Sequence, residues 1–198
     1  MKQDLIERAL RGDELAAQEL HRTYHPAVFR LAYLLLRDSA DADDSTQEAF
    51  IYAFTHLERY DPRRAAFGTW LKIIVTSRCR DLQRRKRVKW LSLQELMRRG
   101  QEPEDTTPEH QPSSVLESMG LQQTVWNALN QMPDKSRQAL ILRYYGDMSY
   151  PEMAEALRCT VNTAKSRVVY GHQALARLLE QQGISRISQD DGQVGDTP

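Results

Sequence analysis

Residues 149–170 read SYPEMAEALRCTVNTAKSRVVY, the pattern of two short helices joined by a tight turn. Ser149 and Glu152 form a capping box that starts the first helix, and Thr160 is placed to cap the second. Apolar residues at helical spacing are expected to face inward: Met153, Ala154, Leu157, Val161, Ala164 and Val168. This layout predicts a helix-turn-helix, whose second helix typically enters the DNA major groove.

The outward face of the second predicted helix carries polar side chains suited to DNA. Asparagine pairs with adenine, arginine or lysine with guanine, and hydroxyl groups with phosphates. The candidates on this face are Asn162, Thr163, Lys165, Ser166, Arg167 and Tyr170. The alternative is an amphipathic helical hairpin with a solvated charged face, because such hairpins are common.

A long helix predicted over residues 70–89 begins apolar and ends basic. Its spacing places three arginines on one face: Arg80, Arg84 and Arg87. Phe67 and Trp70 lie at its start, and aromatic faces stack on unpaired bases while arginines hold phosphates. The segment therefore indicates a contact with single-stranded nucleic acid. The alternative is a helix whose aromatic residues lie in the core and whose basic end is solvated.

An acidic cluster surrounds the start of another predicted helix and contains Asp41, Asp43, Asp44 and Glu48. Negative charge at a helix N-terminus is favourable by itself, which is one explanation for the cluster. The other explanation is an electrostatic face for a basic protein partner. Both explanations stay open on these residues alone.

Charge is distributed unevenly along a chain whose formal net charge is zero. Residues 59–99 hold 13 basic and 3 acidic side chains, and residues 135–178 hold 7 basic and 3 acidic ones. Between them, residues 100–134 hold 6 acidic side chains and no basic one. Two basic blocks separated by an acidic one predict two contacts with a polyanion.

The chain is predicted to be all-α, because glycine and proline are scarce and strand-like alternation is weak. We expect two short helices in the first 20 residues, with Asp13 as an N-cap, then a separate helix over residues 25–37 and a polar break over residues 39–44. The proline-containing acidic stretch over residues 100–114 predicts a flexible linker, with helices resuming near Val115.

Several classes of function lack support in the sequence. Cys79 and Cys159 lie far apart, which argues against a disulfide framework and fits a cytoplasmic protein. No signal peptide or membrane-spanning stretch is expected, and His21 with His25 lacks the further ligands of a metal site. Without a P-loop, a dinucleotide glycine fingerprint, HExxH or GxSxG, we expect neither an enzyme nor a cofactor.

In this order, the motifs resemble those of the sigma-70 family of bacterial RNA polymerase, specifically its small extracytoplasmic-function (ECF) group. Residues 41–50 resemble region 2.2, residues 67–87 resemble regions 2.3 and 2.4, and residues 132–167 resemble region 4. The resemblance implies two small helical domains joined by the linker. Region 2 is expected over residues 1–92, the linker over 93–116 and region 4 over 117–182, followed by a disordered polar tail over 183–198.

The resemblance implies a promoter-specificity subunit that binds core RNA polymerase, through the β′ clamp helices and the β subunit, and promoter DNA. An anti-sigma factor is a further implied partner. The residues implied in polymerase binding are Asp41, Asp44, Gln47, Glu48 and Phe50. Those implied at the −10 element are Phe67, Thr69, Trp70, Lys72, Ser77, Arg78, Arg80 and Arg84. At the −35 element, they are Asn162, Thr163, Lys165, Ser166, Arg167 and Tyr170. Arg84, Arg85 and Arg87 are expected to serve promoter opening more than polymerase binding.

The chain departs from the family pattern in four places. Ser77 stands where an asparagine often helps to capture a flipped base, and Ser45-Thr46 replaces a usually apolar pair. Arg158 occupies the turn position usually held by glycine, where a positive φ would cost about 1 kcal/mol. Tyr170-Gly171 replaces an Arg-Ala pair and puts glycine inside a helix. We therefore expect an unusual or weaker −35 preference.

Two other functions compete with this interpretation. A stand-alone helix-turn-helix regulator would bind duplex DNA without polymerase, but it leaves residues 67–87 unexplained. An enzyme acting on DNA, such as a recombinase, would need a nucleophile and charged partners that the sequence does not offer.

Overall fold

The computed structural model describes residues 2–98 and 120–181, with side chains for 3–90 and 123–181, and these parts contain helices and no strand. The all-α prediction is confirmed. The helices are α1 (Lys2–Leu10), α2 (Glu14–Leu36), α3 (Ser39–Thr55), α4 (Phe67–Arg98), α5 (Gly120–Gln131), α6 (Asp134–Leu140), α7 (Tyr150–Leu157) and α8 (Val161–Gln181). Two short turns, η1 (Leu57–Arg59) and the π-helical η3 (Ile141–Tyr145), connect them.

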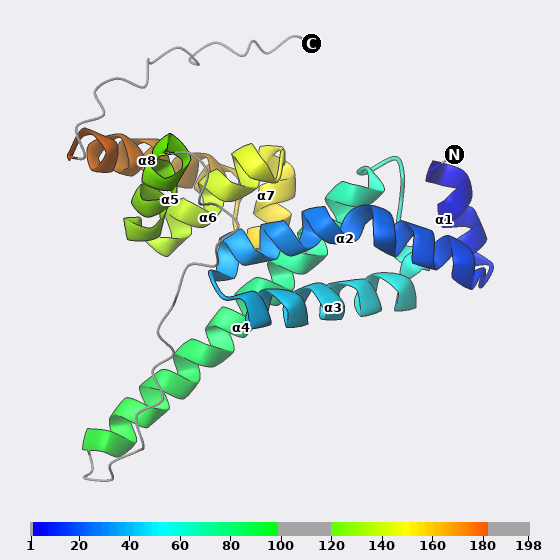
Figure 1. The fold of residues 1–198 in the computed structure, drawn as a ribbon, viewed down its shortest axis with the longest axis horizontal. Helices are drawn as coiled ribbons and strands as arrows, with labels where there is room; N and C mark the ends of the chain where they lie inside the picture. The colour runs from blue at the N-terminus through cyan, green and yellow to red at the C-terminus, as the bar shows by residue number, and fades with distance from the viewer. Residues whose placement is uncertain (1, 99–119, 182–198) are drawn as a thin grey trace.

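The N-terminal bundle consists of α2, α3 and the first half of α4, with α1 packed on α2 (Figure 1). Apolar residues at three-to-four spacing meet in its core, because each helix presents one apolar stripe to the other two. The buried side chains include Leu20, Val28, Leu31, Leu35, Ala49, Ala53, Leu71 and Val75. This bundle holds α3 and α4 in fixed positions, and both carry residues implied in binding.

Helix α2 begins as predicted, because the Asp13 carboxylate accepts hydrogen bonds from the backbone N–H groups of Leu15 and Ala16. The prediction of a separate helix over residues 25–37 is wrong, since α2 runs without interruption through Pro26. A proline inside a helix removes one hydrogen bond and clashes with the preceding turn. The burial of Val28 and Leu31 directly after it offsets this cost.

The expected polar break over residues 39–44 is also wrong. The chain reverses at Arg37, which adopts a left-handed conformation with φ 63°, and at Asp38. The Asp38 carboxylate accepts a hydrogen bond from the Asp41 N–H at 2.8 Å and starts α3 at Ser39. The acidic cluster therefore lies within the first three turns of α3, with its side chains in a fixed helical register.

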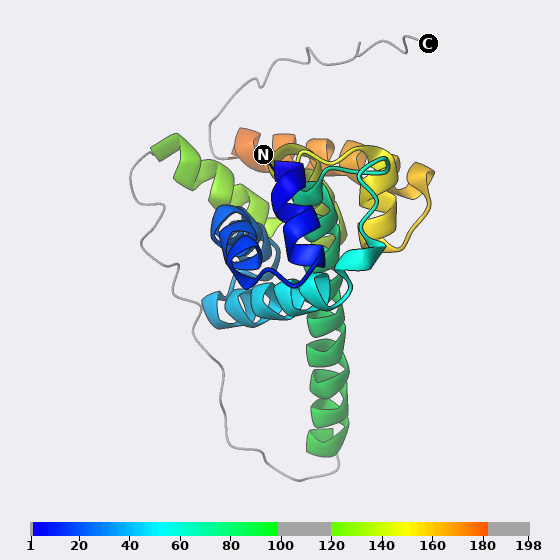
Figure 2. The same cartoon turned by 90° about the vertical axis from the view of Figure 1, so that its right-hand side faces the viewer.

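Helix α4 is longer than the predicted residues 70–89 and runs from Phe67 to Arg98. Beyond Lys86, which pairs with Asp41 of α3, it projects away from the bundle, with no other described helix alongside it (Figures 1 and 2). Residues 93–98, assigned from the sequence to the linker, continue this helix. The remaining linker residues, the expected restart near Val115 and the polar tail lie outside the described residues.

The second bundle contains the helix-turn-helix, formed by α7 and α8. The capping box at Ser149 and Glu152 and the Thr160 cap are present as predicted. Arg158 has φ 48°, so the turn does use the left-handed conformation that glycine adopts without cost. Five of the six residues expected to face inward are buried, but Val161 is exposed, because it begins α8 before that helix packs on its neighbours.

Gly171 has a packing role that its position inside a helix did not predict. A Cβ atom there would lie 2.8 Å from Cγ of Leu140 and 3.2 Å from the backbone oxygen of Ser136. The absence of a side chain therefore lets α6 lie directly against α8.

We expect Gly171→Ala to lower the free energy of unfolding by about 1–3 kcal/mol, because overpacking pushes α6 away from α8. The exposed α8 residue Gln173 provides the control, and Gln173→Ala should stay within about 0.5 kcal/mol of the native chain. Urea unfolding followed by circular dichroism measures both variants. A gain in stability at Gly171, as alanine gives in an open helix, would show that the close approach of α6 is not needed.

The two bundles pack directly on each other. Helix α7 contacts α4 and η3 contacts α2, and the buried apolar residues of both bundles form one continuous cluster. Trp126 of α5 stacks against Tyr33 of α2, with ring centroids 6.2 Å apart. In the described residues, the helix-turn-helix thus packs against the N-terminal bundle (Figure 2).

Candidate nucleic-acid and protein interfaces

The exposed strip on α3 contains three of the five residues implied in polymerase binding. Asp44, Gln47 and Glu48 are exposed at helical spacing, and Ile51 continues the strip one turn later with 66% of its surface exposed. Sequence reasoning missed Ile51 because apolar residues near a core pattern are read as buried. The signal was present, since Asp44, Glu48 and Ile51 are four and three residues apart.

The other two implied residues are placed differently. Asp41 is partly buried and pairs with the ammonium group of Lys86, while Glu48 on the exposed strip lies 4.0 Å from Arg85. Phe50 is buried, with its ring 4.5 Å from that of His21. The structure therefore brings Asp41 to the border between α3 and α4, and makes Phe50 a support beneath the strip rather than part of its surface.

The polar pair Ser45-Thr46 is fully accommodated in the core between α3 and α4. The Thr46 hydroxyl donates a hydrogen bond to the Ala42 backbone oxygen at 2.7 Å. Ser45 hydrogen-bonds with the thiol of Cys79, whose pKa is raised to about 12 by burial. Because both hydroxyls have partners, burying this pair does not leave the unsatisfied polar groups that would loosen the core.

A cluster of aromatic side chains lies at the start of α4, and we call it the aromatic corner: Tyr24, Tyr60, Phe67 and Trp70. Phe67 is buried, with the rings of Tyr24 and Tyr60 each 5.3 Å away and that of Trp70 at 5.8 Å. Burial raises the pKa of the Tyr60 hydroxyl, as expected for a phenol within an apolar cluster. Thr69 and Trp70 are only half-buried. Of the residues implied at the −10 element, the structure therefore places Trp70 and Thr69 near the surface and Phe67 behind them.

The basic residues of α4 divide between two faces. Lys72 and Arg80 lie on one ridge, eight residues apart, and Arg84 continues it as an exposed residue. Ser77 accepts a weak hydrogen bond from Arg80 at 3.4 Å. Arg78 points elsewhere, because its guanidinium lies 4.7 Å over the ring of Tyr52 in α3. Lys72 and Arg80, and not Arg78, face the second bundle, where they donate hydrogen bonds to the backbone oxygens of Gly146 and Ala156.

The outward face of α8 is close to the predicted one. Asn162, Lys165, Ser166 and Tyr170 are exposed, and Val169 joins them with 53% of its surface exposed. Val169 was missed for the same reason as Ile51. Thr163 is half-buried and bonds with Thr160 through their hydroxyls, 2.8 Å apart.

Arg167 and Lys165 each turn toward a neighbouring residue. Arg167 is half-buried and directs its guanidinium to the sulfur of Cys159 at 3.8 Å. The ammonium group of Lys165 lies 5.7 Å from the centre of the Tyr150 ring. Both groups therefore have contacts within the bundle, and Lys165 is the more exposed of the two.

Within the described residues, no helix is long and apolar enough to span a membrane. The same residues contain no group of three or more histidine, cysteine or acidic side chains placed to hold a metal ion.

Comparisons with known proteins agree with this arrangement. Residues 20–88 match the family described as Sigma-70 region 2, and residues 122–178 match Sigma-70, region 4. The chain is 29% identical to the ECF RNA polymerase sigma factor SigW of Bacillus subtilis, with 88% of this chain and 94% of SigW aligned. It is 32% identical to the ECF sigma factor SigM of Mycobacterium tuberculosis, over 89% of this chain and 83% of SigM.

The fold is also similar to that of a solved sigma factor. The structure of RpoE from Bartonella quintana, determined in complex with the anti-sigma factor NepR, superposes with a TM-score of 0.61. It covers 85% of this chain and 98% of that one at 23% sequence identity, so this likeness bears on the fold alone. The two matched regions and the aligned relatives show that the chain belongs to the ECF group of the sigma-70 family.

Proposed function

We propose that this chain binds core RNA polymerase and directs it to promoters by recognising a −10 and a −35 element. The observation that carries the proposal is the presence, in one chain and in this order, of both sigma-70 regions. A basic ridge on α4 and a polar recognition face on α8 provide two separate DNA contacts. A stand-alone regulator would need only the second.

The exposed strip on α3 is assigned to polymerase. Asp44, Gln47 and Glu48 supply a polar and acidic rim, while Ile51 supplies an apolar centre. Interfaces commonly combine a desolvated apolar anchor with a charged rim that steers the partners together. Asp41 and Phe50 support this face from its border and from below, respectively.

The −10 element is assigned to the aromatic corner and the ridge of α4. Trp70 offers an aromatic face to an unpaired base, and Phe67 holds it in position from the core. Lys72, Arg80 and Arg84 follow the strand as phosphate contacts. Ser77 reaches less far than an asparagine, so it contributes one hydroxyl to base selection, and Thr69 lies beside Trp70.

The −35 element is assigned to the exposed face of α8. Asn162 and Lys165 have the donors needed to read base edges, and Ser166 reaches a phosphate. Val169 is suited to contact a thymine methyl group. Thr163, Arg167 and Tyr170 stay candidates at the border of this face.

The two DNA contacts act together because they are linked. Each is salt-sensitive and weak by itself, but attachment of both to polymerase makes the second contact effectively intramolecular. This function requires no catalytic residue in the chain and places it in the cytoplasm, where polymerase and promoters are found. We assign an anti-sigma factor as a further partner, since the sigma factor RpoE was solved with one.

Transcription in vitro tests the proposal. The purified chain with core polymerase is expected to produce discrete run-off transcripts from genomic fragments, and neither component alone should do so. A gel shift with the chain alone on the same fragments distinguishes the rival. Tight binding to duplex DNA without polymerase, combined with no specific transcripts, would identify a stand-alone regulator and overturn the proposal.

A further inference from the structure

The segment between α6 and α7 makes a tight turn just before the helix-turn-helix. η3 (Ile141–Tyr145) is π-helical, and the N–H of Gly146 donates to the Ile141 backbone oxygen, five residues earlier, at 2.9 Å. A Cβ atom at Gly146 would lie 2.5 Å from the backbone oxygen of Leu142, so only glycine fits there. Asp147 then takes a left-handed conformation with φ 51°. Short π-helical turns of this kind are frequent at functional sites.

This turn directs Arg143 toward the start of α7. The Arg143 guanidinium donates to the Met148 backbone oxygen at 3.0 Å, five residues later, and lies 5.3 Å from the centre of the Tyr150 ring. The capping box of Ser149 and Glu152 fixes the backbone at the same point, because it bonds the first turn of α7 to the residue before it. Tyr150 is therefore held both by its backbone and by a cation beside its half-buried ring.

The ring of Tyr150 also contacts the recognition helix. The ammonium group of Lys165, in the second turn of α8, lies 5.7 Å from the ring centre. A cation within about 6 Å of an aromatic ring is attracted by the negative charge of its face. One ring thus receives a cation from the turn before α7 and another from α8. We call Arg143, Tyr150 and Lys165 together the tyrosine hub.

The hub restrains a side chain that would otherwise be free to move. An exposed lysine samples many rotamers, and binding to DNA has to fix one of them at a cost in entropy. Lys165 stays exposed in the hub, and an aromatic ring does not take up its N–H donors as a carboxylate would. The ammonium group is therefore placed in advance and can still donate hydrogen bonds to a base.

The alternative is that the Tyr150 ring serves packing alone. Tyr150 packs against the apolar core, so a bulky side chain is needed there whatever else the ring does. Packing depends on volume, whereas the hub depends on an aromatic face. Phenylalanine and leucine at position 150 therefore distinguish the two explanations, because both fill space but only phenylalanine offers the face.

We propose that Tyr150 is a positioning residue for promoter recognition, whose ring, supported by Arg143, holds the Lys165 ammonium group where it reads the −35 element. This inference rests on the proposed function and names a residue that determines how accurately α8 reads one position. Lysine donates to the O6 and N7 acceptors of guanine in the major groove, so the position is expected to prefer a G·C pair. Tyr150 needs no DNA contact of its own for this role. Its loss is expected to weaken one base preference rather than general affinity.

Acylation of Lys165 in the free, full-length chain tests the contact without polymerase or DNA. The exposed Lys135 of α6 serves as an internal reference. Tyr150→Leu is expected to raise the rate at Lys165 relative to Lys135 about two- to fivefold, the factor that an exposed cation–π contact provides. Tyr150→Phe keeps the ring and should leave this ratio unchanged. Peptide mass spectrometry after a timed reaction gives both rates.

A control variant and a substitute keep this test decisive. Tyr145→Leu removes a tyrosine that is 37% exposed and takes part in none of the cation–π contacts of the described residues, so it should not change the ratio. If circular dichroism shows Tyr150→Leu unfolded, Tyr150→Met replaces it, since methionine adapts to irregular gaps. An unchanged ratio in the folded variant without the ring, or an equal rise in Tyr150→Phe or Tyr145→Leu, would overturn the hub.

Base preference tests the role of the hub in recognition. Reconstituted polymerase is assayed on a promoter found by run-off transcription, with the −35 base pairs changed one at a time. Lys165→Met should remove the preference at one base pair, and Tyr150→Leu should weaken the preference at that same pair about two- to fivefold. When the two are combined, Tyr150→Leu should add nothing there, because residues that act through one contact are not additive. If Tyr150→Leu weakens all sequences equally, or keeps its full effect without Lys165, the positioning role is wrong.

The two measurements separate this inference from the function on which it rests. If the chain supports no specific transcripts, the proposed function fails, and the acylation rates still decide whether Tyr150 holds Lys165. If the chain transcribes normally but Tyr150→Leu and Tyr150→Phe show the same base preferences, the proposed function stands and the positioning role is lost.

Discussion

Replacing Ile51 with glutamate is expected to weaken binding to core RNA polymerase about 30-fold or more, which corresponds to the roughly 2 kcal/mol of an interface hot spot. Ile51 is the one large apolar side chain that the exposed strip on α3 presents to solvent. Desolvating it on binding is favourable, whereas a carboxylate there would have to lose its water without a partner. Binding of labelled chain to core polymerase, titrated at fixed salt, measures the loss.

Leu15 provides a matched control for this variant. It is 71% exposed at the start of α2, outside the strip, so Leu15→Glu introduces the same charge without touching the assigned interface. Both variants should unfold at the temperature of the native chain, since neither side chain is buried. An equal loss of polymerase binding at both positions, or none at Ile51, would show that the strip on α3 is not the polymerase face.

Local signals in the sequence predicted the helix starts well. Asp13, Ser149 and Thr160 each cap the helix that follows, because capping depends only on a side chain and the next three residues. Helix continuity was predicted poorly. A separate helix was expected over residues 25–37, but α2 runs through Pro26 because its buried face overrides the local cost of proline, and this face exists only once α3 and α4 are in place.

The sequence predicted which side of a helix faces outward, but not how deeply individual side chains are buried. Spacing alone placed Asn162 and Lys165 on the exposed side of α8, and Asp44 and Glu48 of the acidic cluster are exposed on α3. It could not tell that Phe67 is buried while Ile51 is exposed, because both are apolar residues near a core stripe. Exposure is decided by which helix packs on which face, and a single sequence carries no direct record of that packing.

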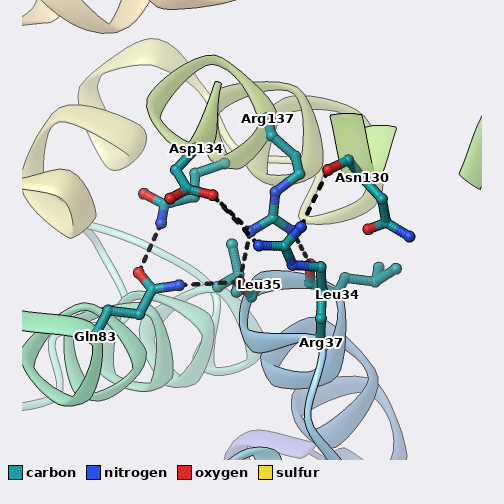
Figure 3. A network of polar contacts seen from close by, with 8 residues as sticks. Leu34, Leu35, Arg37, Gln83, Asn130, Asp134 and Arg137 are labelled. Atoms are coloured by element: carbon teal, nitrogen blue, oxygen red, sulfur yellow. Dashed lines mark hydrogen bonds and ion pairs between the residues drawn. The ribbon is translucent and has the colours of Figure 1, made fainter. Parts of the chain in front are cut away.

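The contact between the two bundles had no signal in the sequence at all. Arginine is rarely buried unless it is paired, so Arg137, which is buried, reads as a surface residue. Its acceptors are the backbone oxygens of Leu34 and Leu35, a group that every residue possesses, and they lie more than 100 positions away (Figure 3). The charge pattern predicted two separate contacts with nucleic acid, and the structure shows that Lys72 and Arg80 of the first basic block donate hydrogen bonds to backbone oxygens of the second bundle.

The second large effect is expected when Arg84 and Arg87 are replaced together by alanine. Both are exposed in the basic run of α4, and helical spacing puts them on the same face as Arg80. Loss of two phosphate contacts should lower the slope of log affinity against log salt by about 1.4 to 1.8 for the promoter complex. Promoter complexes formed by the reconstituted polymerase, measured across a salt series, give this slope, and polymerase binding should change little.

Arg85 was grouped with these two residues on sequence grounds, and the structure separates it. Arg85 lies near Glu48, and the adjacent Lys86 pairs with Asp41, so these two cations neutralise acids implied in polymerase binding. The double variant Arg85→Ala and Lys86→Ala therefore removes the same charge from the same helix and serves as the matched control. It should leave most of the salt slope intact and alter polymerase binding instead. If both double variants reduce the slope equally, the basic run acts only through its total charge, and the division of α4 between a DNA ridge and an acid-pairing face is wrong.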